Sequence, residues 1–330
     1  MDTPNPILTG SRILVTGGAG FIGCNLVERM LEQDNEVIVL DNFSTGKREN
    51  VAPYLNNPRF TLLEGDIRDA AMCERATDGV QYVLHHAALS SVPYSIDAPA
   101  LVTDVNITGT VNVFLAARKA RVRRVVYAAS SATYGDSPTL PKVEADIGKP
   151  LSPYAITKYA NELFAQNFAT LFGLESVGLR YFNVFGPHQD PFGAYAAVIP
   201  LFAQALIAHR QPVINGDGSS SRDYTYIENV IQANQLAALA TGPAVNEVYN
   251  IACGTATTLT DLFDQLRHHL SALDPAIADI DARHGPNRPG DIPHSVADIS
   301  KARRLLRYTP THSLSSGLSA SIPWYFTHLR

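Results

Sequence analysis

A tyrosine and a lysine four residues apart, Tyr154 and Lys158, are the first residues of this chain whose types and spacing suggest chemistry. Side chains at this spacing lie on one face of a helix. A neighbouring ammonium group favours the phenolate and lowers the pKa of tyrosine from about 10 toward neutrality, as an acid–base catalyst requires. On spacing alone, an exposed lysine beside a half-buried tyrosine remains the ordinary alternative.

A serine-rich run supplies a second candidate group, the hydroxyl of Ser130, within Tyr127–Gly135. The run follows an apolar stretch, so we predict that it lies at the carboxyl end of a buried strand. Ligands of open α/β sheets bind at that edge, where a hydroxyl would face them. A plain turn is the alternative for this run taken alone.

A glycine-rich loop, Thr16–Gly23, directly follows the first strand-length run and opens a helical stretch. Glycines there permit a tight turn and close backbone approach to a pyrophosphate, which the helix N-terminus attracts. Gly18, Gly20 and Gly23 satisfy GxGxxG, whereas Gly17, Gly20 and Gly23 satisfy GxxGxxG, and spacing does not choose between them. The strand before and the helix after predict a dinucleotide site rather than a simple turn.

Two acids follow at the ends of later strands. Asp41 lies 18 residues beyond Gly23, where a carboxylate can accept hydrogen bonds from an adenosine ribose and would repel a 2′-phosphate. This predicts NAD rather than NADP. Asp66 could bind the adenine amino group, and a solvated turn aspartate is the alternative.

The elements that must position these residues alternate between strand-length and helix-length segments. The apolar runs are Ile13–Val15, Val37–Leu40, Phe60–Leu63, Val80–Leu84, Val125–Ala128 and Ser176–Arg180, and the helical stretches include Ile22–Leu31, Ala70–Ala76, Val105–Ala120 and Tyr154–Phe172. This order predicts an α/β fold with a Rossmann-type, doubly wound parallel sheet. Frequent proline and glycine after Asn183 predict a smaller C-terminal α/β lobe that forms the substrate pocket. We therefore divide the chain into a cofactor-binding domain, residues 1–183, and a substrate lobe, residues 184–330, with the chain recrossing to the sheet around 222–252.

Composition excludes several other classes of function. The 330 residues are 45% hydrophobic and 17% charged, which is ordinary for a globular enzyme. Because 26 basic against 31 acidic residues give a net charge of −5, we expect no nucleic-acid partner and expect local cations to bind any anionic ligand. No run approaches the roughly 18 uninterrupted apolar residues of a membrane span, and the first residues lack a leader pattern, so we expect a cytoplasmic protein with no membrane partner. Three cysteines without a CxxC pair, and histidine pairs that are adjacent in sequence, predict neither disulfides nor a metal site.

Taken together, the motifs resemble the extended short-chain dehydrogenase/reductase superfamily, and within it the nucleotide-sugar 4-epimerases. In family order stand TGGAGFIG, LDNFSTG, GDIRD, HHAA, NITGT, SSATYG, YAITK, LRYFNVFGP, RDYTYIEN and RPGDIPHSVADISKA, which span almost the whole chain. PLSPYAITKYANEL and GAYAAVIP are especially similar to bacterial UDP-N-acetylglucosamine 4-epimerases of surface-polysaccharide pathways.

The resemblance implies a role for each matching residue. Tyr154 would be the acid–base group on the sugar 4-hydroxyl, Ser130 its hydrogen-bonding partner with Ser131 as the fallback, and Lys158 the group that binds the nicotinamide ribose. The residues implied for NAD are Gly17, Gly20, Phe21, Ile22, Asp41, Asn42, Asp66, Ile67, Ala87, Asn106, Tyr154, Lys158 and Tyr181. Those implied for the UDP-sugar are Ser91, Ser130, Ser131, Asn183, Val198, Val213, Asn215, Arg222, Arg288, Asp291 and Ser295.

The implied reaction is reversible inversion at C4 of a UDP-N-acetylhexosamine through a 4-keto sugar, with tightly bound NAD and no metal. Ala132 and Ser131 stand where dehydratases and decarboxylases of the superfamily carry acids, which disfavours elimination. Ser295 replaces the bulky tyrosine of glucose-specific epimerases and leaves room for an N-acetyl group, whereas Tyr94 and Ser90 depart from close relatives.

Several alternatives to this reading stay open. They are a 4-epimerase of UDP-glucose or of a UDP-hexuronic acid, a net NAD-dependent oxidoreductase or decarboxylase, and a non-catalytic NAD-binding protein. The resemblance also implies a homodimer, formed through the helices around Val105–Ala120 and Pro153–Phe172.

Overall fold

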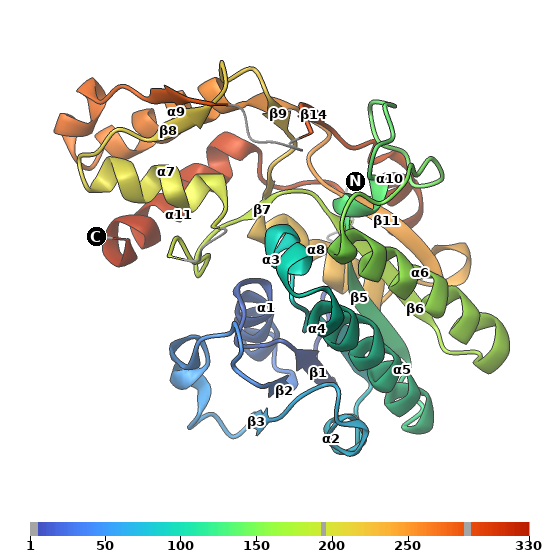
Figure 1. Ribbon diagram of the computed structural model, residues 1–330. Helices are drawn as coiled ribbons and strands as arrows, with labels where there is room; N and C mark the ends of the chain where they lie inside the picture. Colours follow the sequence, from blue (N-terminus) through green and yellow to red (C-terminus); the bar gives the residue numbers. More distant parts are fainter. Residues whose placement is uncertain (1–5, 193–195, 287–291, 330) are drawn as a thin grey trace, which may run out of the picture.

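Seven parallel strands form the central sheet in the computed structural model, which describes residues 6–192, 196–286 and 292–329 (Figure 1). The strands, in spatial order, are β11 (Glu247–Ile251), β6 (Ser176–Tyr181), β5 (Arg124–Ser130), β4 (Tyr82–His85), β1 (Arg12–Thr16), β2 (Glu36–Asp41) and β3 (Phe60–Glu64). Their near-continuous burial explains the apolar runs, since helices cover both faces of the sheet. The predicted doubly wound sheet is confirmed. The strand order reverses between β1 and β4, and ligand crevices form at such points.

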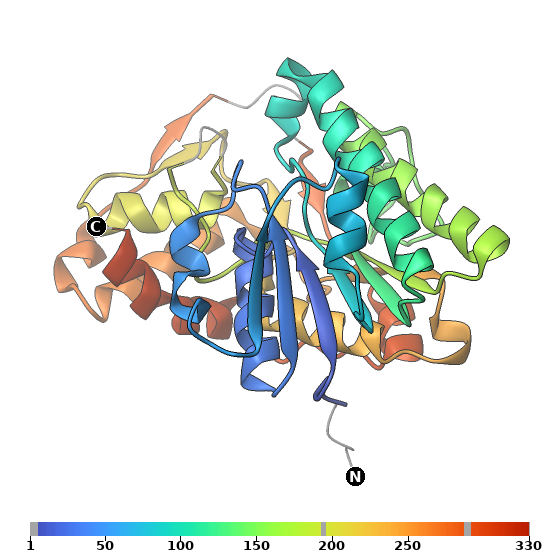
Figure 2. The same cartoon turned by 90° about the horizontal axis from the view of Figure 1, so that it is seen from below.

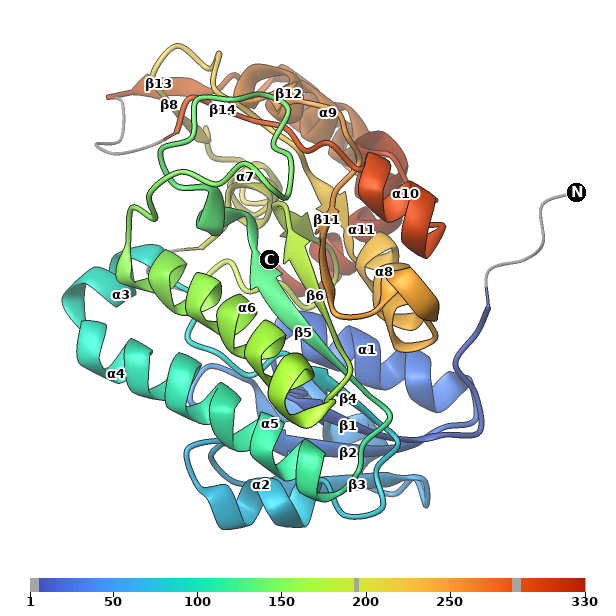
Figure 3. The ribbon, with the colours of Figure 1, turned by 90° about the vertical axis from the view of Figure 1, so that its right-hand side faces the viewer.

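Two groups of helices cover the sheet. Helices α1 (Phe21–Glu32) and α8 (Ile227–Ala238) contact each other on one face. Helices α2 (Ala70–Ala76), α5 (Gly109–Lys119) and α6 (Pro153–Phe172) pack side by side on the other (Figure 3). Strand β11 joins the sheet next to β6, so the segment that follows residue 222 returns to the N-terminal half.

Helix α6 has well-defined signals at both ends. The Ser152 hydroxyl accepts the N–H of Ala155 at 3.1 Å, and Pro153 occupies the first turn, where its missing N–H costs nothing. Gly173 ends the helix with a φ of 66°, a left-handed conformation that favours glycine. Tyr154 and Lys158 therefore lie in the first two turns of a helix whose start is fixed by its capping residues.

A buried ion pair fixes this helix against the sheet. The Arg180 guanidinium on β6 donates to both Glu162 oxygens, at 2.9 and 2.7 Å, and both side chains are almost fully buried. A bidentate pair is geometrically specific, so it sets the rotation of α6 about its axis.

The helical segment before β5 is longer than the sequence predicts. Helix α4 (Pro99–Thr103) runs through a π-helical turn, Asp104–Thr108, into α5. The combined helix, Pro99–Lys119, is long and apolar enough to cross a membrane by length and composition alone, and 44% of its most apolar window is buried. Core helices of globular proteins pass the same test. Its exposed apolar side chains are relevant to the pairing of two chains.

The C-terminal lobe consists of helices and very short strands, and α7, α9 and α11 gather to the left of the sheet in Figures 1 and 2. Its helices are α7 (Val198–Ile207), α9 (Leu259–Ser271), α10 (Ser300–Leu306) and α11 (Leu314–His328). Its strands are β7 (Val184–Phe185), β8 (Val213–Asn215), β9 (Ser221–Arg222), β10 (Thr225–Tyr226), β12 (Thr257–Thr258), β13 (Arg283–Gly285) and β14 (His294–Ser295). One short helix, α3 (Val92–Asp97), packs on α6 from the N-terminal half.

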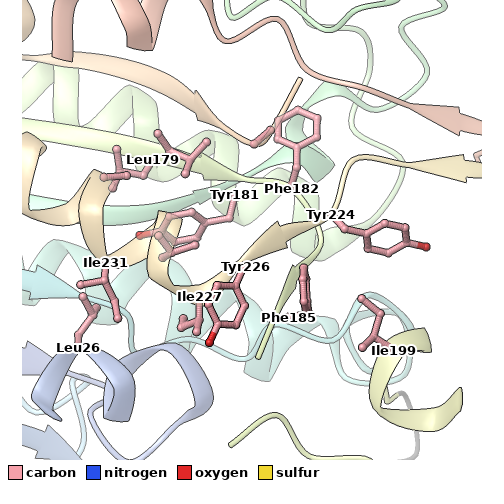
Figure 4. Close-up of a cluster of buried hydrophobic side chains, with 14 of the residues drawn as sticks. Leu26, Leu179, Tyr181, Phe182, Phe185, Ile199, Tyr224, Tyr226, Ile227 and Ile231 are labelled. Atoms are coloured by element: carbon pink, nitrogen blue, oxygen red, sulfur yellow. The ribbon is translucent and has the colours of Figure 1, made fainter. Parts of the chain in front are cut away.

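One hydrophobic cluster joins the lobe to the sheet (Figure 4). It includes Leu26 of α1, Leu179 of β6, Ile231 of α8 and Ile199 of α7, all buried. Since apolar packing continues between the two parts, the lobe is held on the sheet as a wall of the ligand crevice.

Candidate active site

A cavity of about 380 Å³ opens at the carboxyl ends of the central strands. It is lined by all but one of the residues predicted to bind the cofactor: Gly17, Gly20, Phe21, Ile22, Asp41, Asn42, Asp66, Ile67, Ala87, Tyr154, Lys158 and Tyr181. Ser130 lines it as well. The fold therefore brings together residues from seven different segments of the chain.

The glycine loop is shaped by close backbone approach. A Cβ on Gly17 would lie 2.7 Å from the Ala87 nitrogen, and one on Gly23 would lie 2.0 Å from the Gly17 oxygen. Gly18 instead packs against the Val39 side chain and does not line the cavity. The set that lines the cavity is therefore Gly17, Gly20 and Gly23, and a side chain at Gly17 or Gly23 would collide with neighbouring backbone.

Asp41 joins the glycine loop to the end of β2. Its carboxylate accepts the N–H groups of Ala19 at 2.9 Å and Phe43 at 2.8 Å, and burial raises its pKa. Each oxygen still has a lone pair that could accept a ribose hydroxyl.

Asp66, which follows the neighbouring strand β3, is held ionised. Arg68 donates to both of its oxygens and lowers its pKa to about 2, and the Asn42 amide donates at 2.8 Å. A carboxylate fixed in this way can accept an exocyclic amino group.

Ser130, Tyr154 and Lys158 meet on one wall of the cavity, with at most 9% of each residue exposed. The Lys158 ammonium lies 5.9 Å from the centre of the Tyr154 ring and donates to the Ala128 carbonyl at 2.8 Å. Burial lowers the pKa of Lys158 to about 8. Burial raises the pKa of Tyr154, and a hydrogen bond with Ser130 opposes that rise.

The first turn of α6 is braced from outside the cavity. The Tyr154 backbone N–H donates to the Ser95 hydroxyl of α3 at 3.1 Å, and Ser95 is fully buried. Asn106, the predicted cofactor residue that does not line the cavity, lies in the π-helical turn. Its amide bonds to the backbone of Leu89 and to the Thr157 hydroxyl at 3.1 Å, so in this structure it positions the cavity wall.

Adjacent histidines orient other parts of the site. Both ring nitrogens of His85 are hydrogen-bonded, to Thr16 at 2.7 Å and Thr110 at 3.0 Å, which leaves no nitrogen for a metal. His86 bonds to the Tyr181 hydroxyl at 2.9 Å and fixes that ring in the cavity wall.

A second cavity, of about 280 Å³, lies in the C-terminal lobe, and its lining residues fall between Asn183 and Leu259. It is lined by five residues predicted to bind the substrate: Asn183, Val198, Val213, Asn215 and Arg222. Segment 181–183 connects the two cavities, because Tyr181 lines the first and Asn183 the second.

The remaining predicted substrate residues lie in other places. Ser91 accepts the N–H of Tyr94 as the N-cap of α3, and Ser131 begins a short 3₁₀ turn after Ser130. Ser295 pairs with Arg222 in the β9–β14 ladder, at the edge of the second cavity. Arg288 and Asp291 lie outside the described residues.

Sequence reasoning missed some of the residues that line the cavities. Lys47, Asn50, His188 and Asp190 line the first cavity, and Gln189 lines the second. Asn50 ends a short 3₁₀ turn, Arg48–Asn50, and the others belong to loops without a periodic pattern. The GPHQDP segment carried a signal only through its glycine and proline.

Comparison with known proteins agrees with this geometry. The sequence profile of the NAD dependent epimerase/dehydratase family matches residues 13–252. The UDP-glucose 4-epimerase of Mycolicibacterium smegmatis is 35% identical over 317 residues, which cover 95% of this chain and 98% of that protein.

Two solved structures are similar along nearly the whole chain. The UDP-N-acetylglucosamine 4-epimerase of Methanobrevibacter ruminantium M1, in complex with UDP-N-acetylmuramic acid, has a TM-score of 0.89 and 38% identity and covers 97% of this chain and 99% of its own. The UDP-glucose 4-epimerase of Thermotoga maritima, with UDP-glucose, has a TM-score of 0.88 and 36% identity and covers 97% and 100%.

Proposed function

The chain belongs to the NAD dependent epimerase/dehydratase family, and from this premise we propose that it inverts C4 of a UDP-N-acetylhexosamine. The observation that carries the proposal is the juxtaposition of Ser130, Tyr154 and Lys158 in a dinucleotide cavity that adjoins a second cavity containing Arg222. The glycine loop fits NAD, because its glycines allow the close backbone approach that shapes the turn before α1, and the start of α1 with its free N–H groups can bind a diphosphate. NAD, when bound, supplies the hydride acceptor and later the hydride donor.

Tyr154 and its neighbours move the proton. As the C4 hydrogen leaves the sugar with its electron pair, the Tyr154 phenolate takes the proton of the 4-hydroxyl. Return of hydride to the opposite face of the 4-keto sugar, with return of the proton from Tyr154, gives the epimer with no net oxidation. Lys158 stabilises the phenolate, and Ser130 hydrogen-bonds to it.

The choice of sugar rests on volume near the second cavity. Ser295 is next to Arg222 across the β9–β14 ladder. We expect its small side chain to leave space for an acetamide at C2. One of the solved relatives is a UDP-N-acetylglucosamine 4-epimerase, whereas others are UDP-glucose 4-epimerases. Hexose and hexuronic-acid substrates are therefore the alternatives to be tested.

The test uses purified protein with UDP-GlcNAc, UDP-GalNAc, UDP-glucose and an N-acetylated UDP-hexuronic acid, with products resolved by NMR. We expect UDP-GlcNAc and UDP-GalNAc to interconvert without accumulation of reduced nicotinamide. Tyr154→Phe should lower kcat by at least about 10²-fold, the usual contribution of general acid–base catalysis, while NAD stays bound. Accumulating NADH, or a decarboxylated product, would identify a net oxidoreductase or decarboxylase instead.

Replacing Ser295 by tyrosine tests the size argument. The added ring should overpack a pocket that the acetamide already fills, at a cost of about 1–3 kcal/mol. We expect kcat/KM for UDP-GalNAc to fall about tenfold to more than hundredfold while that for UDP-galactose changes little. Equal losses for both substrates would remove Ser295 as a determinant of size.

We further propose that two copies of the chain pair through α5 and α6. Exposed Leu115 of α5 and Ile156, Leu163 and Leu171 of α6 lie on adjacent packed helices, an arrangement of apolar side chains that a partner would cover.

A further inference from the structure

A strap of the C-terminal half crosses to the glycine-loop side of the cofactor cavity. It comprises Gly186–Asp190, directly after β7. The Pro187 carbonyl accepts a hydrogen bond from the Asn25 side chain of α1 at 3.1 Å. Three residues farther on, the Asp190 carboxylate lies 3.4 Å from the Lys47 ammonium. Each contact joins residues more than a hundred positions apart in the sequence, so both fasten the strap to the N-terminal half.

His188 makes the central fastening. Its Nδ1 lies 3.1 Å from the Asn50 side-chain oxygen. Asn50 donates its amide N–H to the carbonyl of Ala19 in the glycine loop at 2.8 Å, so its oxygen is the atom that faces His188. That oxygen can only accept, and therefore Nδ1 of His188 carries the hydrogen. The Asn50 side chain thus links His188 to the glycine loop.

The His188 ring is also supported from behind. It packs on Trp324 of α11 with ring centres 5.3 Å apart, and Trp324 stacks on His328 at 4.5 Å. The backbone of His188 has a φ of 69°, a left-handed conformation that is costly for a residue with a side chain. The surrounding contacts therefore hold the ring in one place despite an unfavourable backbone.

Residues that make these contacts also line the first cavity. Lys47, Asn50, His188 and Asp190 all form part of its wall together with the glycine loop. The charge of Asp190 is offset by Lys47, so this part of the wall does not present an unpaired anion to a diphosphate.

We propose that this strap is a latch that retains NAD, with His188 as its central residue. The inference rests on the proposed function, because an epimerase restores its NAD in every cycle and has no need to exchange it. For NAD to leave past the strap, the contacts of Pro187, His188 and Asp190 must break together. His188 is a positioning residue in this account, since it acts by holding the wall of the cavity closed and not on the sugar.

The test measures how fast NAD bound to the holoenzyme exchanges with excess isotopically labelled NAD, with no sugar present. His188→Ala should exchange about 2- to 12-fold faster than the wild type, the range for loss of one hydrogen bond. Asp190→Asn should exchange up to about fivefold faster, as for a partly exposed ion pair. The matched control is His209→Ala, because His209 hydrogen-bonds to Asp274 at 2.9 Å and does not line the cavity. It should exchange at the wild-type rate.

A further variant separates the hydrogen bond from folding and packing. His188→Phe keeps an aromatic ring for Trp324 but cannot bond to Asn50, and it replaces His188→Ala in the test if the alanine variant does not fold. Wild-type exchange rates in the His188 variants, or wild-type protein that loses NAD within seconds, would overturn the latch. Accelerated exchange in these variants together with no inversion of any UDP-sugar would uphold the latch and overturn the proposed function.

Discussion

At the scale of single residues, the charge on Lys158 and the hydrogen bond with Ser130 are the two influences placed to favour the Tyr154 phenolate. Burial alone raises the pKa of Tyr154, and a buried lysine with a pKa of about 8 is still largely protonated near neutral pH. A unit charge about 6 Å away is worth about 2–3 kcal/mol at an effective dielectric constant of about 20.

Lys158→Met should therefore raise the pKa of Tyr154 by about 1–2 units. Because the phenolate is the form that accepts the proton, the rising limb of kcat against pH should move to higher pH by the same amount. The measurement is a pH profile of kcat with saturating NAD. An unmoved rising limb would show that Lys158 does not tune Tyr154.

Asp41 should set the choice between NAD and NADP. An added 2′-phosphate would meet its carboxylate at close range, and like charges disfavour binding. We expect calorimetry on apo-protein to show much weaker binding of NADP than of NAD. Asp41→Asn should reduce the difference between the two affinities. Equal affinities in the wild type would mean that Asp41 serves only to bond Ala19 and Phe43.

Many of the residues predicted to bind the cofactor could be named from the sequence because they follow predicted strands, whereas Tyr154 and Lys158 were named from their spacing on a helix. Asp41 and Asp66, for example, could be placed from the strand ends alone. The roles of Asn106 and His188 could not be inferred in this way. The position of Asn106 depends on a π-helical turn, and that of His188 on contacts with Asn50 and Trp324, which are distant in sequence.

At the scale of elements, Asp223 holds together the short strands that carry Arg222. It is fully buried, and its carboxylate accepts the N–H groups of Cys253 and Gly254 at 2.9 Å and of Ala297 at 3.3 Å. Burial raises its pKa to about 6, so it is ionised at slightly alkaline pH. Three segments of the lobe thus meet at one side chain.

Asp223→Asn should lower the free energy of unfolding by about 1–3 kcal/mol, because an amide N–H₂ would face backbone N–H donors. Thermal unfolding at about pH 8 measures the effect, above the pKa given for Asp223. Asp78→Asn, at an exposed position, is the control and should unfold like the wild type. A variant at position 223 as stable as that control would show that these hydrogen bonds contribute little.

Six of the seven sheet strands were predicted, because burial gives most of them a continuous apolar run. Strand β11 was not among the predicted strands, since the polar Glu247 and Asn250 interrupt its apolar pattern. The two-residue strands of the lobe were not predicted either, since pairs such as Ser295 with Arg222 come together only through distant segments. The helix predicted at Val105–Ala120 begins earlier, at Pro99, because a π-helical turn lets it continue past Asp104 and Asn106.

At the scale of the whole molecule, the predicted boundary between the two parts at residue 183 does not separate two independent units. Helix α8 and strand β11 complete the N-terminal sheet, and Ile199 of the lobe packs in the same cluster as Leu26 of α1. The lobe therefore cannot bury its apolar face without the sheet. The second cavity begins directly at this boundary, where Asn183 lines it together with lobe residues such as Arg222.

The exposed face of α6 leads to a prediction about assembly. Leu163 is 49% exposed, and Ile156 and Leu171 lie on the same helix with larger exposed fractions. A single chain therefore leaves apolar surface in water there.

If two chains pair through α5 and α6, Leu163→Glu places a charge in the interface. The variant should then elute as a monomer in size-exclusion chromatography with light scattering, where the wild type is a dimer. Leu273→Glu is the matched control, because Leu273 is 52% exposed but follows α9 in the C-terminal lobe, and it should stay dimeric. If both variants dissociate, or if neither does, the contact between chains does not depend on α6. A wild type that elutes as a monomer would contradict the pairing itself. Since Tyr154 lies in the first turn of the same helix, loss of the dimer should also lower kcat if pairing helps hold α6 in place.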